Sequence, residues 1–113
     1  AGFSFGAWIG MQLLMRRPEI TGFISVSPPA NMYDFSFLAP CPSSGMIING
    51  GADRIAPTSA TVELVDKLRE QKGITVTHNE MEGAGHFFEE PYMDQMLDTV
   101  TTYVKKRLTE TTR

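Results

Sequence analysis

Three residues that can together perform nucleophilic catalysis occur at widely separated positions in the chain. Ser4 carries a hydroxyl, Asp53 a carboxylate and His86 an imidazole. A serine hydroxyl is a weak nucleophile until an imidazole takes its proton, and a carboxylate can hold that imidazole in the required tautomer. We therefore predict acyl transfer through a covalent serine intermediate, with Ser4 as nucleophile, His86 as general base and Asp53 as the supporting acid.

The nucleophile candidate lies in a short motif, Gly2-Phe3-Ser4-Phe5-Gly6, directly before a predicted helix. A serine on a sharp strand-to-helix turn has strained backbone angles. The residues two before and two after it approach each other, so both are expected to be small. Such a turn would also aim the N–H groups of the helix N-terminus at a reacting carbonyl. A simpler interpretation is a glycine-rich turn in which Ser4 only caps the helix.

Asp53 and His86 each follow a predicted strand, and the order Ser, Asp, His is one of the known chain orders of such triads. Each has a simpler interpretation as well. Asp53 could cap local N–H groups in a turn, and His86 could be an ordinary surface-loop histidine beside Gly83 and Gly85. The second histidine, His78, is predicted to be an exposed strand residue.

Short apolar strands alternate with amphipathic helices along the chain. Strands are predicted over residues 22–27, 46–49 and 74–80, the last of them near a sheet edge. Helices are predicted over 5–17, from 57 to the turn before residue 73, and over 91–108. This alternation predicts an α/β fold, a parallel sheet with helices packed on both faces and any ligand site along the carboxyl edge. The apolar face of the last helix is predicted to comprise Met93, Met96, Leu97, Val100 and Val104.

Composition narrows the range of functions. The chain has 113 residues, 42% hydrophobic and 20% charged, as expected of one globular domain. A formal net charge of −3 argues against nucleic-acid binding and against a polybasic membrane anchor. No apolar run approaches the length needed to span a bilayer. The single cysteine, Cys41, excludes an internal disulfide, is predicted to be a small buried residue, and suggests a reducing, cytoplasmic setting.

These motifs are similar to those of a known enzyme family. The chain resembles the C-terminal half of an α/β-hydrolase, in particular the small, lidless bacterial group related to dienelactone hydrolase and the X-Pro dipeptidyl-peptidase-like domains. Residues 2–7 resemble the nucleophile elbow of that group, residues 48–57 its acid-bearing loop and residues 85–88 its histidine loop. Residues 35–42 are similar to the segment that precedes the acid strand.

The resemblance implies roles for these residues. Ser4 would be the nucleophile, Asp53 the acid and His86 the base, and the backbone N–H of Phe5 would be one oxyanion donor. It implies neither a metal nor an organic cofactor. The substrate would be a small molecule with an acyl group, such as an ester, thioester, lactone or peptide, and a homo-oligomer is compatible with the family.

The resemblance also implies that residues 1–113 form a partial α/β-hydrolase domain. Family members have several strands before the elbow, and a loop among them supplies the second oxyanion donor. Only residues 1–3 precede Ser4 here. We therefore expect N-terminal strands of the fold to be missing, the chain to be part of a longer protein, and the isolated chain to have little activity.

Two alternatives remain at this stage. The chain could be a non-catalytic α/β-hydrolase-fold binding protein. A metal hydrolase is less compatible, because Glu82, Glu89 and Glu90 offer carboxylates near His86 but no second imidazole is suitably placed. The aromatic segment at 31–38, with Tyr33, Phe35 and Phe37, could shape acyl specificity or simply pack the fold.

Overall fold

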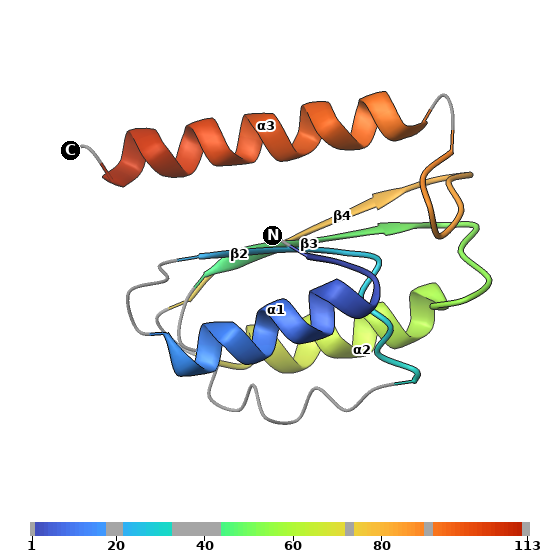
Figure 1. The fold of residues 1–113 in the computed structure, drawn as a ribbon, viewed down its shortest axis with the longest axis horizontal. Helices are drawn as coiled ribbons and strands as arrows, with labels where there is room; N and C mark the ends of the chain where they lie inside the picture. The colour runs from blue at the N-terminus through green and yellow to red at the C-terminus, as the bar shows by residue number, and fades with distance from the viewer. Residues whose placement is uncertain (1, 18–21, 33–43, 72–73, 90–91, 112–113) are drawn as a thin grey trace.

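The computed structural model describes residues 2–17, 22–32, 44–71, 74–89 and 92–111, with side chains described up to residue 107. Strands and helices alternate as Figure 1 shows. The elements are β1 (Gly2–Phe3), α1 (Phe5–Arg16), β2 (Phe23–Val26), β3 (Gly45–Gly50), α2 (Thr58–Arg69), β4 (Val76–Met81) and α3 (Tyr92–Thr111).

The four described strands form one parallel sheet in the order β1-β2-β3-β4. Gly2 pairs with Ser25 between β1 and β2, and Ile48 pairs with Val26 on one side and with Asn79 on the other. β2 and β3 are the interior strands of the described sheet, and β3 is buried along its whole length. β4 lies at one edge, as predicted. The expected parallel α/β fold is confirmed.

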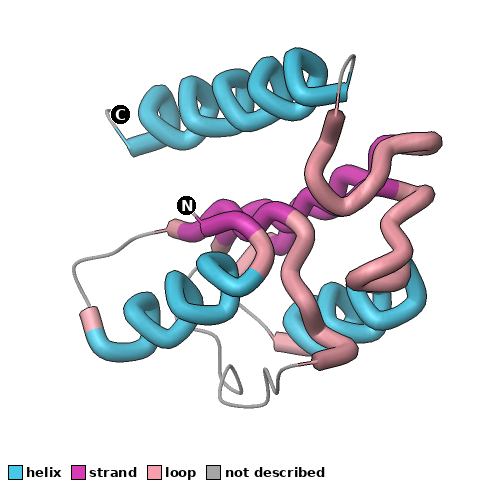
Figure 2. The backbone as a smooth tube through the Cα atoms, turned by 45° about the vertical axis from the view of Figure 1, so that its right-hand side comes forward, coloured by secondary structure: helices cyan, strands magenta, loops and turns pink. Residues whose placement is uncertain are grey.

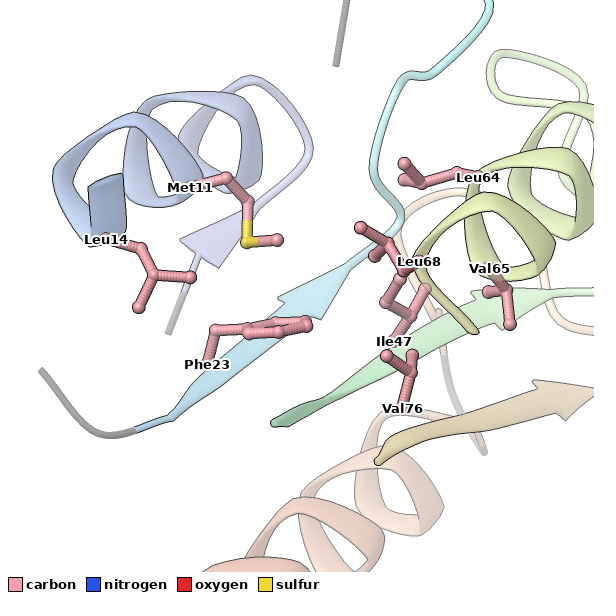
Figure 3. Packing of buried hydrophobic residues seen from close by; sticks show 8 residues of the cluster. All are labelled: Met11, Leu14, Phe23, Ile47, Leu64, Val65, Leu68 and Val76. Carbon is pink, nitrogen blue, oxygen red and sulfur yellow. The ribbon is translucent and has the colours of Figure 1, made fainter. Parts of the chain in front are cut away.

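Helices cover both faces of the sheet, which is also as predicted. In Figure 1, α1 and α2 lie below the sheet and α3 lies above it. The core on the lower face is drawn in Figure 3, where side chains from the two helices converge on the middle strands. Its buried members are Met11, Leu14, Phe23, Ile47, Leu64, Val65, Leu68 and Val76.

A second core lies between the sheet and α3, around Val26, Ile48 and Met96. The apolar face predicted for α3 is partly wrong. Leu97 is 51% exposed and Val104 is 39% exposed. The helix instead packs through a stripe rotated away from those two residues, which a period of 3.6 residues also allows. The side chains of this stripe are Tyr92, Met93, Met96, Val100 and Tyr103.

Most predicted element boundaries differ from the observed ones by one or two residues. α3 differs most, since it extends to Thr111, about one turn beyond the predicted end. Pro57 is the N-cap of α2 rather than its first residue. The expectations for Cys41 and for the aromatic rings at 33–37 lie outside the described residues.

The carboxyl ends of the strands lie along one side of the sheet. The loops after β3 and β4 leave the sheet together on the right in Figure 1, and Figure 2 shows them side by side from a second direction. Within the described residues, no helix is both long and apolar enough to cross a membrane.

Candidate active site

The turn between β1 and α1 holds Ser4 in an unusual backbone conformation. Its φ is 55° and its ψ is −121°, a region that residues other than glycine rarely occupy. The backbone N–H of Ser4 donates to the carbonyl of Val26 on β2 at 2.8 Å. Ser4 stands at the N-cap of α1, yet its side chain makes no capping hydrogen bond. The interpretation of Ser4 as a simple cap is therefore wrong.

The two glycines around Ser4 have different roles. A Cβ on Gly2 would collide with the backbone carbonyl of Gly6 and would lie 2.7 Å from the Cα of Ala7. Only a residue without a side chain therefore allows β1 and α1 to meet at this turn. A Cβ on Gly6 would meet nothing within 4 Å among the described atoms. The described atoms thus require a small residue at Gly2 but place no such restriction on Gly6.

Asp53 lies in the loop between β3 and α2, and it uses its two carboxylate oxygens separately. Oδ1 accepts hydrogen bonds from the backbone N–H groups of Ile55 and Ala56, both at 2.8 Å. Oδ2 lies 2.7 Å from Nδ1 of His86. The predicted turn-capping role and the predicted contact with His86 therefore both occur, and the first fixes the carboxylate for the second.

His86 lies in the loop between β4 and α3, and it bridges the other two residues. Its Nε2 is 2.7 Å from Oγ of Ser4, while its Nδ1 faces Asp53. His86 is only 5% exposed, so it is not a surface-loop histidine. With Nδ1–H donated to the carboxylate, Nε2 is left as an acceptor for the Ser4 hydroxyl. The structure brings together the three side chains that the sequence singled out.

Two aromatic rings flank the imidazole of His86. The ring of Phe87 stands nearly perpendicular to it, with centroids 4.9 Å apart. The ring of Phe3 approaches it edge-on at 5.9 Å and lies 6.0 Å from Phe87. Phe87 is 54% exposed. A partly open apolar surface therefore borders the imidazole of His86.

The prediction for His78 is wrong. It lies two residues after Val76, so both side chains point to the sheet face that α2 covers. His78 is half-buried, and its Nε2 lies 2.6 Å from Oδ1 of Asn49. Asn49 in turn donates to the hydroxyl of Thr58, the first residue of α2, at 3.2 Å.

Burial of the imidazole is the main cause that lowers the pKa of His78 below its usual 6.5. Three neighbouring charges add smaller effects on this pKa: Glu80 and Asp66 act to raise it, whereas Arg69 acts to lower it. Because the amide oxygen of Asn49 can only accept, Nε2–H of His78 is the donor in this contact.

Sequence reasoning missed Ser27, a fully buried serine directly after β2. Its hydroxyl donates to the main-chain carbonyl of His86 at 2.8 Å. The signal that could have found it is a polar residue between an apolar strand and the pair Pro28-Pro29, where a buried hydroxyl needs a partner.

Known proteins provide an independent comparison. A protein of unknown function from Agrobacterium tumefaciens, described as a candidate α/β hydrolase, superposes on 96% of the chain with a TM-score of 0.94 and 58% identity. The chain covers 50% of that protein. An uncharacterised protein of Rickettsia prowazekii is 52% identical over an alignment 91 positions long that covers 77% of the chain and 38% of the relative. The chain thus spans half or less of the length of these relatives.

More distant structures carry a more specific description. An α/β serine hydrolase without a lid from Xanthomonas campestris is 32% identical, with a TM-score of 0.69 over 83% of the chain and 40% of its own length. An α/β serine hydrolase homologue from Coxiella burnetii is 31% identical, with a TM-score of 0.65 over 83% of the chain and 43% of its own. No family model matches the chain. The chain therefore has an α/β fold that it shares, over 40–50% of their length, with proteins described as an α/β hydrolase candidate, an α/β serine hydrolase and an α/β serine hydrolase homologue.

Proposed function

We propose that this chain carries the nucleophile, base and acid of a serine hydrolase that acts on esters, thioesters or related acyl compounds. The observation that carries the proposal is the unbroken chain of short contacts from Ser4 Oγ through the imidazole of His86 to Asp53. The description of structural neighbours as α/β serine hydrolases supports the same chemistry.

In the proposed reaction, Ser4 Oγ attacks the carbonyl carbon of the substrate while Nε2 of His86 takes the hydroxyl proton. The carbonyl π electrons move onto oxygen and give a tetrahedral oxyanion. The intermediate collapses, the bond to the leaving group breaks, and His86 returns its proton to that group. A water molecule then repeats the sequence on the acyl-enzyme and regenerates Ser4.

Two features of the site would stabilise charge during these steps. Asp53 faces the imidazolium that forms on His86, and its position is fixed by two backbone N–H groups. The oxyanion forms close to the first residue of α1, where the backbone N–H of Phe5 is the proposed donor.

The surroundings of the site favour a substrate with an apolar group. Phe3 and Phe87 border the imidazole of His86, and both rings are more than one third exposed. An apolar group held there would be close to the proton donor for the leaving group. A small acyl compound is therefore the proposed partner, and the single cysteine makes the cytoplasm the proposed location.

A fluorophosphonate probe tests the nucleophile in the naturally expressed protein that carries these residues. The probe should form a covalent adduct on the peptide that contains Ser4, detected by mass spectrometry. Ser4→Ala should abolish the adduct. Ser59→Ala should leave it intact, because Ser59 is an exposed serine on α2. An adduct that persists in Ser4→Ala would show that Ser4 is not the nucleophile.

A further inference from the structure

The end of β2 contacts two parts of the candidate site through two consecutive residues. The carbonyl of Val26 accepts the backbone N–H of Ser4 at 2.8 Å. The hydroxyl of Ser27 donates to the main-chain carbonyl of His86 at 2.8 Å. The backbone N–H of Ser27 donates to the carbonyl of Ile48 on β3, also at 2.8 Å. One short segment thus ties the backbones of Ser4 and His86 to the centre of the sheet.

Ser27 adopts a backbone conformation that is unfavourable for its residue type. Its φ is 52°, in the left-handed region that favours glycine. It also precedes Pro28, and a residue before proline strongly prefers extended angles. Among the described residues other than glycine, only Ser4, Ser27 and Phe88 have a positive φ. Ser4 lies in the turn before α1 and Phe88 in the loop of His86, while Ser27 contacts that loop from the end of β2. Such strain is commonly retained at functional sites.

We propose that Ser27 is a positioning residue, whose hydroxyl holds the His86 backbone so that Nε2 stays within reach of Ser4 Oγ. This role rests on the proposed hydrolase function. Ser27 is fully buried, so its hydrogen bond to the His86 carbonyl is made away from competing water. Glycine would relax the backbone at this position, but it would leave the His86 carbonyl without the hydroxyl that it accepts from.

Positioning matters because catalysis is more sensitive to distance than stability is. A shift of about 1 Å in a catalytic group can cost about a hundredfold in rate. The imidazole of His86 is held by Asp53 at one nitrogen, and its backbone is held by Ser27. Without the hydrogen bond from Ser27 to the His86 carbonyl, the imidazole could still contact Asp53 but could shift relative to Ser4.

Three substitutions of Ser27, made in the naturally expressed protein that carries these residues, separate positioning from stability. Ser27→Gly removes the hydroxyl and relieves the strain, so it should unfold at a temperature close to that of the wild type. Its kcat should nevertheless fall at least tenfold, with little change in KM. Ser27→Ala also removes the hydroxyl but keeps the strain, so kcat should fall equally and the unfolding temperature should fall further. Ser27→Thr keeps a hydroxyl on a branched side chain, so it should be the least stable and yet retain the most activity.

Ser25→Ala is the matched control. Ser25 is another buried serine of the same strand and is 2% exposed. Its kcat should stay within about twofold of the wild type. If kcat instead follows the unfolding temperature across all four variants, or if Ser27→Gly keeps full kcat, Ser27 has only a structural role and the proposal is wrong.

A second readout does not depend on turnover. In ¹⁵N-histidine-labelled protein, the Nδ1–H of His86 that faces Asp53 should give a downfield proton resonance, with His78→Gln used for assignment. This resonance should be sharp in the wild type and in Ser25→Ala, and should broaden or shift in Ser27→Gly. An unchanged resonance would overturn the positioning role. The two proposals can fail separately. If the wild-type resonance is sharp but Ser4 forms no probe adduct, the hydrolase function is wrong. The role of Ser27 in holding His86 is then decided by whether this resonance changes in Ser27→Gly.

Discussion

His86 Nδ1 lies 2.7 Å from Asp53 Oδ2, and the two side chains are 3% and 0% exposed. The other oxygen of Asp53 accepts from two backbone N–H groups. In Asp53→Asn, those groups would hold the amide oxygen, so the amide NH₂ would face His86. Nδ1 would then have to accept, Nε2 would carry the proton, and Ser4 would lose its base.

If the proposed function is correct, Asp53→Asn should reduce kcat by about 10⁴-fold, as reversal of the tautomer does in a serine protease, with little loss of stability. The acyl-enzyme burst with p-nitrophenyl acetate measures this effect. Asp94→Asn, at an exposed position on α3, should leave the burst unchanged. A normal burst in Asp53→Asn would contradict the role given to Asp53.

The two glycines of the turn should respond differently to the same substitution. Gly2→Ala places a methyl group against the backbone of Gly6 and Ala7, and it should destabilise the fold by about 1–3 kcal/mol and misplace Ser4. Gly6→Ala places the methyl group in open space on α1, where alanine favours the helix by about 1 kcal/mol. Urea denaturation of both variants measures the difference. Equal destabilisation would mean that the turn is tight on both sides.

A buried hydroxyl offers a route to a more stable protein. Thr61 on α2 is fully buried, and its Oγ1 has no hydrogen-bond partner among the described atoms. Thr61→Val keeps the shape and removes the unpaired group, so stability should rise by about 1 kcal/mol. Thr61→Ala, which also removes the methyl group, should lower stability by a similar amount. A loss of stability in Thr61→Val would reveal a partner for the hydroxyl.

The lowered pKa of His78 predicts a pH dependence of stability. Below pH 6.5 the unfolded chain takes up a proton at this residue more readily than the folded chain does. The free energy of unfolding should therefore fall as the pH drops from 6.5 towards the lowered pKa, and this contribution should level off below it. His78→Gln removes that part of the dependence, which denaturation curves between pH 5 and 8 can measure. Parallel stability profiles for the two proteins would contradict the assignment.

Sequence reasoning identified the candidate site well because its signals are local. A glycine that must sit against a backbone carbonyl, as Gly2 does, leaves a recognisable motif. Asp53 and His86 each follow a strand of the sheet, and parallel strands bring their carboxyl ends to the same edge. The same logic gave the parallel sheet and its two helical layers.

The expectations that failed concern side chains whose surroundings come from distant parts of the chain. His78 was predicted to be exposed, but α2 and Asn49 cover the face to which it points. The packed stripe on α3 was misjudged because the helix carries apolar residues outside the packed stripe as well, such as Leu97 and Val104, and contact with the sheet decides which of them are buried. Ser27 carries no local motif, since its partner is 59 residues away.

Each of the three central side chains is supplied by a separate loop, and each loop leaves a different strand. Enzymatic turnover would then depend on all three of these strands. Local unfolding at the end of any one of them would abolish turnover before the whole molecule unfolded. In a collection of random variants, inactivating changes should therefore be spread along β1, β3 and β4 rather than gathered around Ser4 alone.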